Sequence, residues 1–397
     1  MISKKMVGFV QNNSVIRAMF EEGKIMAAKY GKENVYDFSL GNPSVEPPKE
    51  ITEAIVEIAT KEEPNLVHGY MSNSGYEDVR EAIAQSLNGR FGTTFTQKNI
   101  LMTVGAAGGL NVIFKTLLNP GDEVIAFAPY FVEYRSYVRN YDGEIVEISP
   151  NTETFQPNLA ELAEKITPKT KAVIVNTPNN PTGVVYTEET IQAMAKVLCE
   201  KEKELGTSIY LISDEPYREL VYTDVEPPYL TKYYHNTIVG YSFSKSLSLP
   251  GERIGYLVIP DTVDDADDVI AAATIANRIL GYVNAPSLMQ RVVAKCLDAK
   301  VDVDTYRKNR DLLYKTLTDN GFTCAKPDGA FYLFVKAPDG DDKAFTNRAK
   351  AERLLIVPGS SFACAGYCRV AYCVSYEMIE RSIPSWESLA KSYGLKG

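Results

Sequence analysis

Histidine and cysteine are scarce in this chain of 397 residues, which limits the metal and disulfide chemistry open to it. The two histidines are His68 and His235, and the pattern HExxH does not occur. We therefore expect no metal site. The six cysteines form no CxxC pair and are too few for a disulfide scaffold, so reduced thiols are expected.

Two further absences limit the partners and the cellular location that we expect for the protein. The net charge is −9, without the basic excess that is typical of nucleic-acid binding. The apolar runs fall short of the roughly 20 residues that span a bilayer, and the first residues lack a signal-peptide pattern. We therefore expect a cytoplasmic protein that binds neither nucleic acid nor a membrane.

Several catalytic motifs are also missing. The patterns GxSxG, GxxxxGK[ST] and GxGxxG do not occur. The residues SFSK at 242–245 match the SxxK of serine acyl-transferring enzymes, but that chemistry also needs SDN and KTG, and neither tripeptide is present. Acyl transfer and a phosphate loop of the NTPase type are therefore not expected.

The sequence does contain a regular alternation of strands and helices. Continuous apolar runs such as KAVIV (171–175) indicate strands buried on both faces, as in a parallel sheet covered by helices. We predict an α/β fold with a large domain over 46–295, built on a mostly parallel seven-stranded sheet. A smaller α+β domain would combine 1–45 and 296–397, with a first helix capped by Asn13 or Ser14 and a strand at 35–40.

Polar segments follow several of these strands. They are NTPNNPTG (176–183), SDEPYREL (213–220) and SFSKSLSLPGERIGY (242–256), and GYCRVAYCVS (366–375) is a fourth polar segment. Ligands bind beyond the carboxyl ends of parallel strands, so we expect these side chains to converge. A buried lysine beside an arginine has a lowered pKa and can attack a carbonyl. With an aspartate for a pyridinium nitrogen and an arginine for a phosphate, the set predicts a pyridoxal phosphate pocket.

These segments resemble the signatures of the fold-type I, class I and II aminotransferases, the aspartate aminotransferase superfamily. SFSKSLSLPGERIGY is similar to the lysine signature of that family, NNPTG and DEPY to two cofactor-binding elements, and VPGSSF with YCRVAY to a carboxylate-binding strand. HGYMSNSGYEDVREAIA is similar to the segment before a large-domain helix. The resemblance covers nearly the whole chain. It implies transamination from an L-amino acid to a 2-oxo acid by a homodimer that uses pyridoxal 5'-phosphate.

The resemblance also implies a role for individual residues. Lys245 would form the Schiff base and move protons, Asp214 would pair with the pyridinium nitrogen, and Tyr217 and Asn180 would bind the phenolic oxygen. The phosphate would be bound by Arg253, Ser242, Ser244 and the backbone of Gly105, Ala106 and Ala107. Phe131 would stack on the ring, and Tyr70 would reach the cofactor of the partner subunit. The substrate would meet Arg369 through its α-carboxylate, together with Gly41, Asn42 and Asn180.

Two alternatives and the choice of substrate stay open at this point. A pyridoxal phosphate lyase of the C–S β-lyase type, or a decarboxylase, shares this pocket. A transcriptional regulator with an aminotransferase-like domain would need about 100 additional N-terminal residues with a basic helix, which the chain lacks. A specialist for dicarboxylates needs a second fixed cation. Ala107 supplies none, and Arg278 stands about one residue out of register, so we predict a neutral or aromatic amino donor rather than aspartate.

Overall fold

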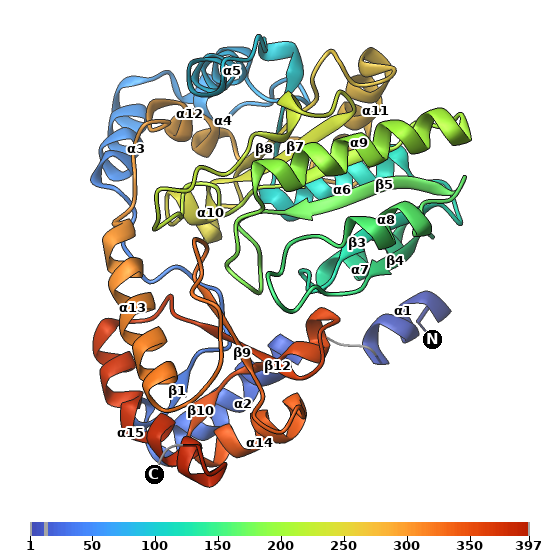
Figure 1. The fold of residues 1–397 in the computed structure, drawn as a ribbon. Helices are drawn as coiled ribbons and strands as arrows, with labels where there is room; N and C mark the ends of the chain where they lie inside the picture. The colour runs from blue at the N-terminus through green and yellow to red at the C-terminus, as the bar shows by residue number, and fades with distance from the viewer. Residues whose placement is uncertain (1, 12–14, 396–397) are drawn as a thin grey trace.

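Seven strands form one large sheet in the computed structural model, which describes residues 2–11 and 15–395 (Figure 1). Neighbouring strands run parallel except β8, which is antiparallel to both β2 and β7. In spatial order the strands are β2 (Ile100–Thr103), β8 (Gly255–Val258), β7 (Thr237–Ser242), β6 (Tyr210–Asp214), β5 (Thr170–Asn176), β3 (Glu123–Phe127) and β4 (Glu144–Ile148). The predicted α/β class and seven-stranded, mostly parallel sheet are confirmed.

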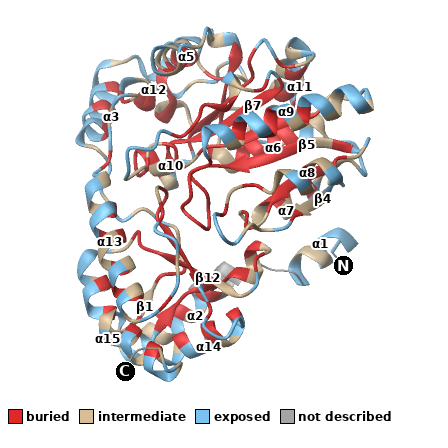
Figure 2. Ribbon diagram, viewed as in Figure 1, coloured by how far each residue is buried: buried red, intermediate tan, exposed pale blue. Residues whose placement is uncertain are grey.

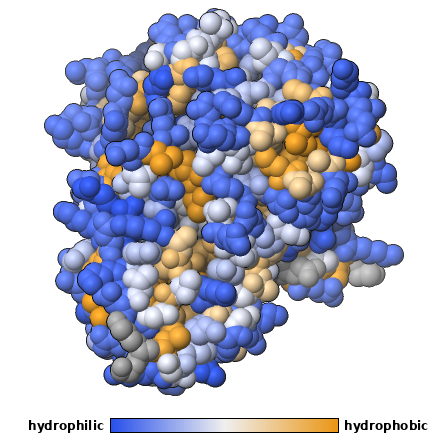
Figure 3. Space-filling model, in the orientation of Figure 1, coloured by the Kyte–Doolittle hydropathy of each residue, from blue (hydrophilic) through white to orange (hydrophobic). Residues whose placement is uncertain are grey.

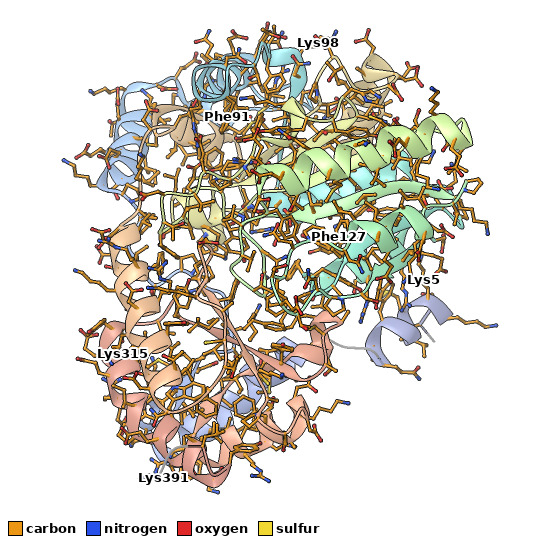
Figure 4. The ribbon with its side chains drawn as sticks, in the orientation of Figure 1. Lys5, Phe91, Lys98, Phe127, Lys315 and Lys391 are labelled. Carbon is orange, nitrogen blue, oxygen red and sulfur yellow. The ribbon has the colours of Figure 1, made fainter. Side chains whose placement is uncertain are left out.

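Helices cover both faces of this sheet, because alternate side chains of each strand point to opposite sides. Val124 and Ala126 of β3 pack on one face, while Ile125 and Phe127 pack on the other. Figure 2 shows the strands of the sheet as buried, and Phe127 is labelled in Figure 4. The first face carries α6 (Gly105–Leu117), α7 (Glu133–Asn140) and α11 (Ala266–Ile279). The second carries α3 (Lys49–Lys61), α4 (Pro64–His68), α5 (Glu77–Phe91), α8 (Leu159–Lys165), α9 (Glu188–Leu205) and α12 (Ser287–Lys295).

A smaller group of elements packs below the large sheet in Figure 1. Its antiparallel sheet has the order β11 (Val357–Pro358), β12 (Tyr367–Ala371), β9 (Tyr332–Lys336), and β1 (Tyr36–Asp37) pairs in parallel with β10 (Leu354–Leu355). The helices are α2 (Val15–Tyr30), α13 (Val303–Asp319), α14 (Asp342–Ala351) and α15 (Tyr376–Ser392). Trp386 is fully buried in their shared core, beside Phe38 and Phe322. The domain boundaries expected from the sequence stay a prediction.

The N-terminal elements depart in part from expectation. Helix α2 lies where a helix was predicted, but its proposed caps fall outside the described residues. The strand expected at 35–40 is only the pair Tyr36–Asp37, because β10 offers two partners and the chain then turns toward Gly41. An additional helix, α1 (Lys4–Gln11), lies beside the large sheet, where Lys5 Nζ is 2.9 Å from Asp142 Oδ1 (Figure 4).

Short elements complete the description. Helix α10 (Phe243–Ser246) follows β7, and single 3₁₀ turns occur at η1 (Lys32–Asn34), η2 (Gln97–Asn99), η3 (Leu230–Lys232), η4 (Pro250–Glu252) and η5 (Gly359–Phe362). The face of the molecule in Figure 3 is mostly hydrophilic, as expected when apolar side chains fill the space between layers. None of the described helices combines the length and the hydropathy needed to cross a membrane.

Candidate active site

A cavity of about 280 Å³ opens at the carboxyl ends of β5, β6 and β7. Because these strands are parallel neighbours, the polar residues that follow them meet at one edge of the sheet. The N-terminus of α6 and, from the smaller group of elements, Gly41 and Arg369 of β12 complete the wall. The predicted residues that line the cavity are Gly41, Ala106, Ala107, Phe131, Asn180, Asp214, Tyr217, Ser242, Ser244, Lys245, Arg253 and Arg369.

Lys245 stands in the short helix α10, immediately beyond β7. Ser242 caps this helix, because its side chain accepts a hydrogen bond from the Ser244 backbone N–H. Lys245 Nζ donates to the Gly41 carbonyl at 2.8 Å. Burial lowers the pKa of Lys245 to about 8; Cys373 opposes this shift, while the positive charges of Arg253 and Arg369 reinforce it. The amine is therefore neutral in a useful fraction of molecules near neutral pH.

Asp214 is the last residue of β6 and is buried. Tyr134 Oη donates to its Oδ2 at 2.6 Å, whereas Oδ1 is buried without a hydrogen-bond partner among the described residues. Burial raises the pKa of Asp214 to about 7; the Tyr134 hydroxyl lowers it, and the nearby Glu215 raises it further. A cationic N–H placed at Oδ1 would favour the ionised carboxylate and satisfy the unpaired oxygen.

Arg369 joins the two halves of the cavity and is only 2% exposed. Its Nη1 donates to Asn180 Oδ1 at 3.0 Å and its Nη2 to the Ser39 carbonyl at 2.5 Å, while Nε is buried without a partner among the described residues. The guanidinium lies over the Tyr332 ring, 4.5 Å from its centroid. This planar group keeps donors for a carboxylate, which it can bind as a fork.

Tyr217 and Asn180 lie near each other beside Asp214. The hydroxyls of Tyr217 and Tyr332 are 2.9 Å apart and share a hydrogen bond. Because Asn180 Oδ1 already accepts from Arg369, its amide Nδ2 is the group that remains to donate. These two side chains therefore offer a hydroxyl and an N–H to one part of the cavity wall.

A cradle for an anion forms where α6 begins. The first backbone N–H groups of a helix have no partners within it, and they attract negative charge. Gly105 opens α6 with φ +72°, and a Cβ added there would lie 2.8 Å from Arg253 Nη2. Glycine is therefore needed for the arginine to approach. Ser242 Oγ donates to Ser244 Oγ at 2.8 Å on the other side of this cradle.

This donor set fits pyridoxal phosphate. The cradle of N–H groups, Arg253 and two hydroxyls suits a phosphate, and the unpaired Asp214 Oδ1 suits a protonated ring nitrogen. Lys245 offers a partly neutral amine, and the side chain of Phe131 lines the wall as a flat ring. The phosphate, the ring nitrogen and the aldehyde thus each have a partner of suitable chemistry in one cavity.

Three predicted residues, Asn42, Gly105 and Tyr70, are not among those that line the cavity, and several lining residues were missed. Gly105 lies next to Arg253, and Tyr70 is 95% exposed on a loop outside this cavity. The missed lining residues are Leu110, Tyr137, Asn176, Pro216, Pro250 and Tyr332, to which Tyr134 is added behind Asp214. Asn176, Pro216 and Pro250 belong to segments already singled out in the sequence. Tyr332 and Tyr134 arrive by packing and carry no local signal.

Comparison with known proteins agrees with this geometry. The family model for class I and II aminotransferases matches residues 33–384. The crystal structure of an aminotransferase from Eubacterium rectale shares 48% identity, covers 99% of both chains and gives a TM-score of 0.96. The aspartate aminotransferase of Thermotoga maritima is 30% identical, with 95% of this chain and 97% of that protein covered. The aspartate/prephenate aminotransferase of Thermus thermophilus is 32% identical, with coverages of 87% and 88%.

Proposed function

This chain belongs to the class I and II aminotransferases, and on that premise we propose which of its residues carry out the transfer. It is a pyridoxal-phosphate-dependent transaminase, which moves an amino group from an amino acid to a 2-oxo acid. The lyase and decarboxylase alternatives are not favoured, since the matched relatives are named as aminotransferases. The observation that carries the residue assignment is the convergence of Lys245, Asp214 and Arg369 on one cavity.

Residues of one cavity would hold the cofactor. Arg253, Ser242, Ser244 and the N–H groups of Gly105, Ala106 and Ala107 would bind its phosphate. Asp214 Oδ1 would accept a hydrogen bond from the ring nitrogen, and Asn180 and Tyr217 would donate to the phenolic oxygen. Phe131 would pack against the ring. Tyr134 keeps Asp214 in place by occupying Oδ2, which leaves Oδ1 for the ring.

Lys245 is the acid and base of the reaction. When bound, the cofactor supplies an aldehyde carbon that the amine attacks and a protonated ring that withdraws electrons. Lys245 Nζ takes the proton from the Cα of the bound amino acid and can return it to a neighbouring carbon. A pKa of about 8 suits this exchange near neutral pH, because neither protonation state is rare.

The substrate is placed by Arg369, which binds the α-carboxylate, while Gly41 and Asn180 line the same part of the cavity. Among the described residues that line it, the cations are Lys245, Arg253 and Arg369, and each already has a task. A second substrate carboxylate would find no cation of this chain there. A neutral or aromatic donor is therefore preferred over aspartate, although two relatives at 30% and 32% identity carry names that include aspartate.

The enzyme acts as a homodimer with shared active sites. Tyr70, Ile275, Ile279 and Val283 are exposed apolar side chains, with exposures of 95%, 50%, 57% and 36%. The loop of Tyr70 is tied to the other two segments, since Asn73 Nδ2 donates to the Val283 carbonyl and Asn277 Nδ2 to the Asn73 carbonyl. A second copy of the chain that covered this surface would bury these side chains. Tyr70 of each copy would then lie at the cavity of the other copy. The cytoplasmic location stays a prediction.

A half-reaction screen tests the proposed function. Single amino acids are added to purified holoenzyme, and the loss of cofactor absorbance is followed together with the 2-oxo acid formed. Transamination gives one 2-oxo acid per site and needs an acceptor to continue. Continuous formation of pyruvate and ammonia, or of carbon dioxide, without an acceptor would contradict it.

A further inference from the structure

Four polar side chains meet at the opposite edge of the large sheet, near the amino ends of β6 and β7. Cys199 and Glu202 are three residues apart on α9, so they share one face of that helix. His235 lies just before β7, and Asp264 just before α11. The cavity with Lys245 lies beyond the carboxyl ends of the same strands, so this cluster belongs to neither the cofactor nor the substrate site.

Three of these side chains, those of Cys199, Glu202 and His235, have the separations of an open cation site, and Asp264 lies beside His235. One ligand atom each from Cys199, Glu202 and His235 lies within 4.8 Å of the others. His235 Nε2 is 4.0 Å from Glu202 Oε2 and 3.6 Å from Asp264 Oδ1. Both distances exceed a hydrogen bond. They approach the edge of roughly 3.5 Å expected for a tetrahedron with zinc–ligand bonds of about 2.0–2.3 Å. Side-chain shifts of about 1 Å would close the site on such an ion.

Each carboxylate is oriented by a hydrogen bond to the oxygen that does not face His235. Glu202 Oε1 accepts from the Ile209 backbone N–H at 2.8 Å, and Asp264 Oδ2 accepts from Ser208 Oγ at 2.6 Å. In each case the other oxygen is the one that faces the imidazole of His235. Outer hydrogen bonds of this kind orient metal ligands and hold them ready. They are a separate observation from the distances.

The negative charge of the two carboxylates favours the binding of a cation. Glu202 and Asp264 form no ion pair with a lysine or arginine among the described residues; their charged neighbour is His235. A divalent ion between these groups would neutralise the carboxylates and stabilise the thiolate of Cys199.

We propose that Cys199, Glu202 and His235 bind one Zn²⁺ ion, and that Asp264, beside His235, moves in to complete the site. A thiolate and an imidazole select zinc over Mg²⁺ and Ca²⁺, which prefer oxygen ligands only. As the Zn–S bond forms, the Cys199 S–H bond breaks and its proton passes to water, and no oxidation is involved. The ion would tie α9 to the segments before β7 and α11. Its effect is therefore on stability, and catalysis at the other edge of the sheet stays unchanged.

The test is zinc titration of the holoenzyme, produced without a polyhistidine tag and first freed of metals with a chelator. We expect one Zn²⁺ per chain to be retained after gel filtration, release of about one proton, and a rise of several degrees in Tm. The same concentration of Mg²⁺ should give no rise. Loss of a residue that only orients a metal ligand already weakens binding by about 10–100-fold, so removal of a ligand by His235→Gln or Cys199→Ser should cost at least about tenfold in affinity.

The chain offers matched controls. His68→Gln removes the other, also exposed, histidine, and Cys324→Ser removes a thiol outside the cluster; both should bind zinc like the wild type. Circular dichroism checks that all variants are folded, and Cys199→Ala provides a second thiol variant. The proposal is overturned if the wild type retains no zinc. It is equally overturned if His235→Gln and Cys199→Ala both bind zinc as tightly as the wild type, which would place the ion elsewhere.

Discussion

Polar side chains at the two edges of the large sheet differ in burial and in hydrogen bonding. At the carboxyl ends, Asp214 and Lys245 are withdrawn from water, and Asp214 Oδ1 has no partner among the described residues. At the amino ends, His235 and Cys199 are exposed, and Glu202 and Asp264 each have one oxygen bound by a hydrogen bond. Buried groups without partners destabilise a fold. Asp214 Oδ1 and Arg369 Nε lack partners among the described residues and belong to side chains that line the cavity, which indicates that this edge is completed by a ligand that is part of the working enzyme.

Removing the amine at the carboxyl edge should have the largest effect. Lys245→Ala should lower kcat by at least about 10⁴-fold, because one residue both bonds to the cofactor and moves the Cα proton. The variant should still bind the cofactor noncovalently, as shown by gel filtration and absorbance. Lys115→Ala, an exposed lysine on α6, is the matched control and should keep full activity. A Lys245→Ala enzyme within tenfold of the wild type would contradict the assignment.

Asp214→Asn should separate stability from activity at the same edge. We expect kcat to fall by about 10²–10³-fold, since the ring nitrogen loses its anionic partner. Asp214→Glu should retain more activity. Equal Tm values of the wild-type and Asp214→Asn apoenzymes at every pH would contradict this account.

The raised pKa of Asp214 determines whether the stability of the apoenzyme rises or falls with pH. The pKa of Asp214 is about 7 in the folded chain and 3.8 in the reference state. Between these values the folded chain binds a proton that the unfolded chain releases, so this carboxyl makes stability fall as pH rises from 3.8 to 7. Thermal unfolding of the apoenzyme should therefore show Asp214→Asn more stable than wild type at pH 8, by a few degrees in Tm, and about equal at pH 4.

Much of the carboxyl edge could be predicted from the sequence because its residues follow strands directly. Asp214 ends β6, and Lys245 comes three residues after β7 ends. Tyr134 could not be predicted in the same way. It comes from α7, 80 positions before Asp214, and only tertiary packing brings the two together. The cluster proposed to bind zinc could not be predicted either, because its residues come from a helix and two loops and match no ligand spacing.

Sharing of the site between subunits predicts a smaller effect. Tyr70→Phe should weaken cofactor binding by about tenfold, the size expected for one lost hydrogen bond to a charged group. Mixed with Lys245→Ala, it should form hybrid dimers in which one site carries neither change. Cofactor affinity and activity should therefore recover in the mixture, and both are measured there. A monomer in sedimentation at micromolar concentration, or no recovery after confirmed subunit exchange, would exclude sharing.

The smallest effect is expected at Arg278, which is exposed in the last turn of α11. Since it lies outside the cavity of its own chain, Arg278→Ala should change the ratio of kcat/KM for aspartate and phenylalanine by less than about threefold. Leucine and alanine serve as further donors. If aspartate is preferred a hundredfold and the variant reverses that order, Arg278 is the second cation from the partner subunit.

The central claim is that the carboxyl edge is an active site built around Lys245. Borohydride reduction of the holoenzyme, followed by proteolysis and mass spectrometry of the peptides, tests it most directly. The account predicts one reduced cofactor per chain, attached to the peptide that contains Lys245, and none in Lys245→Ala. Attachment to any other lysine, or an unmodified Lys245 peptide in a fully active preparation, would contradict it.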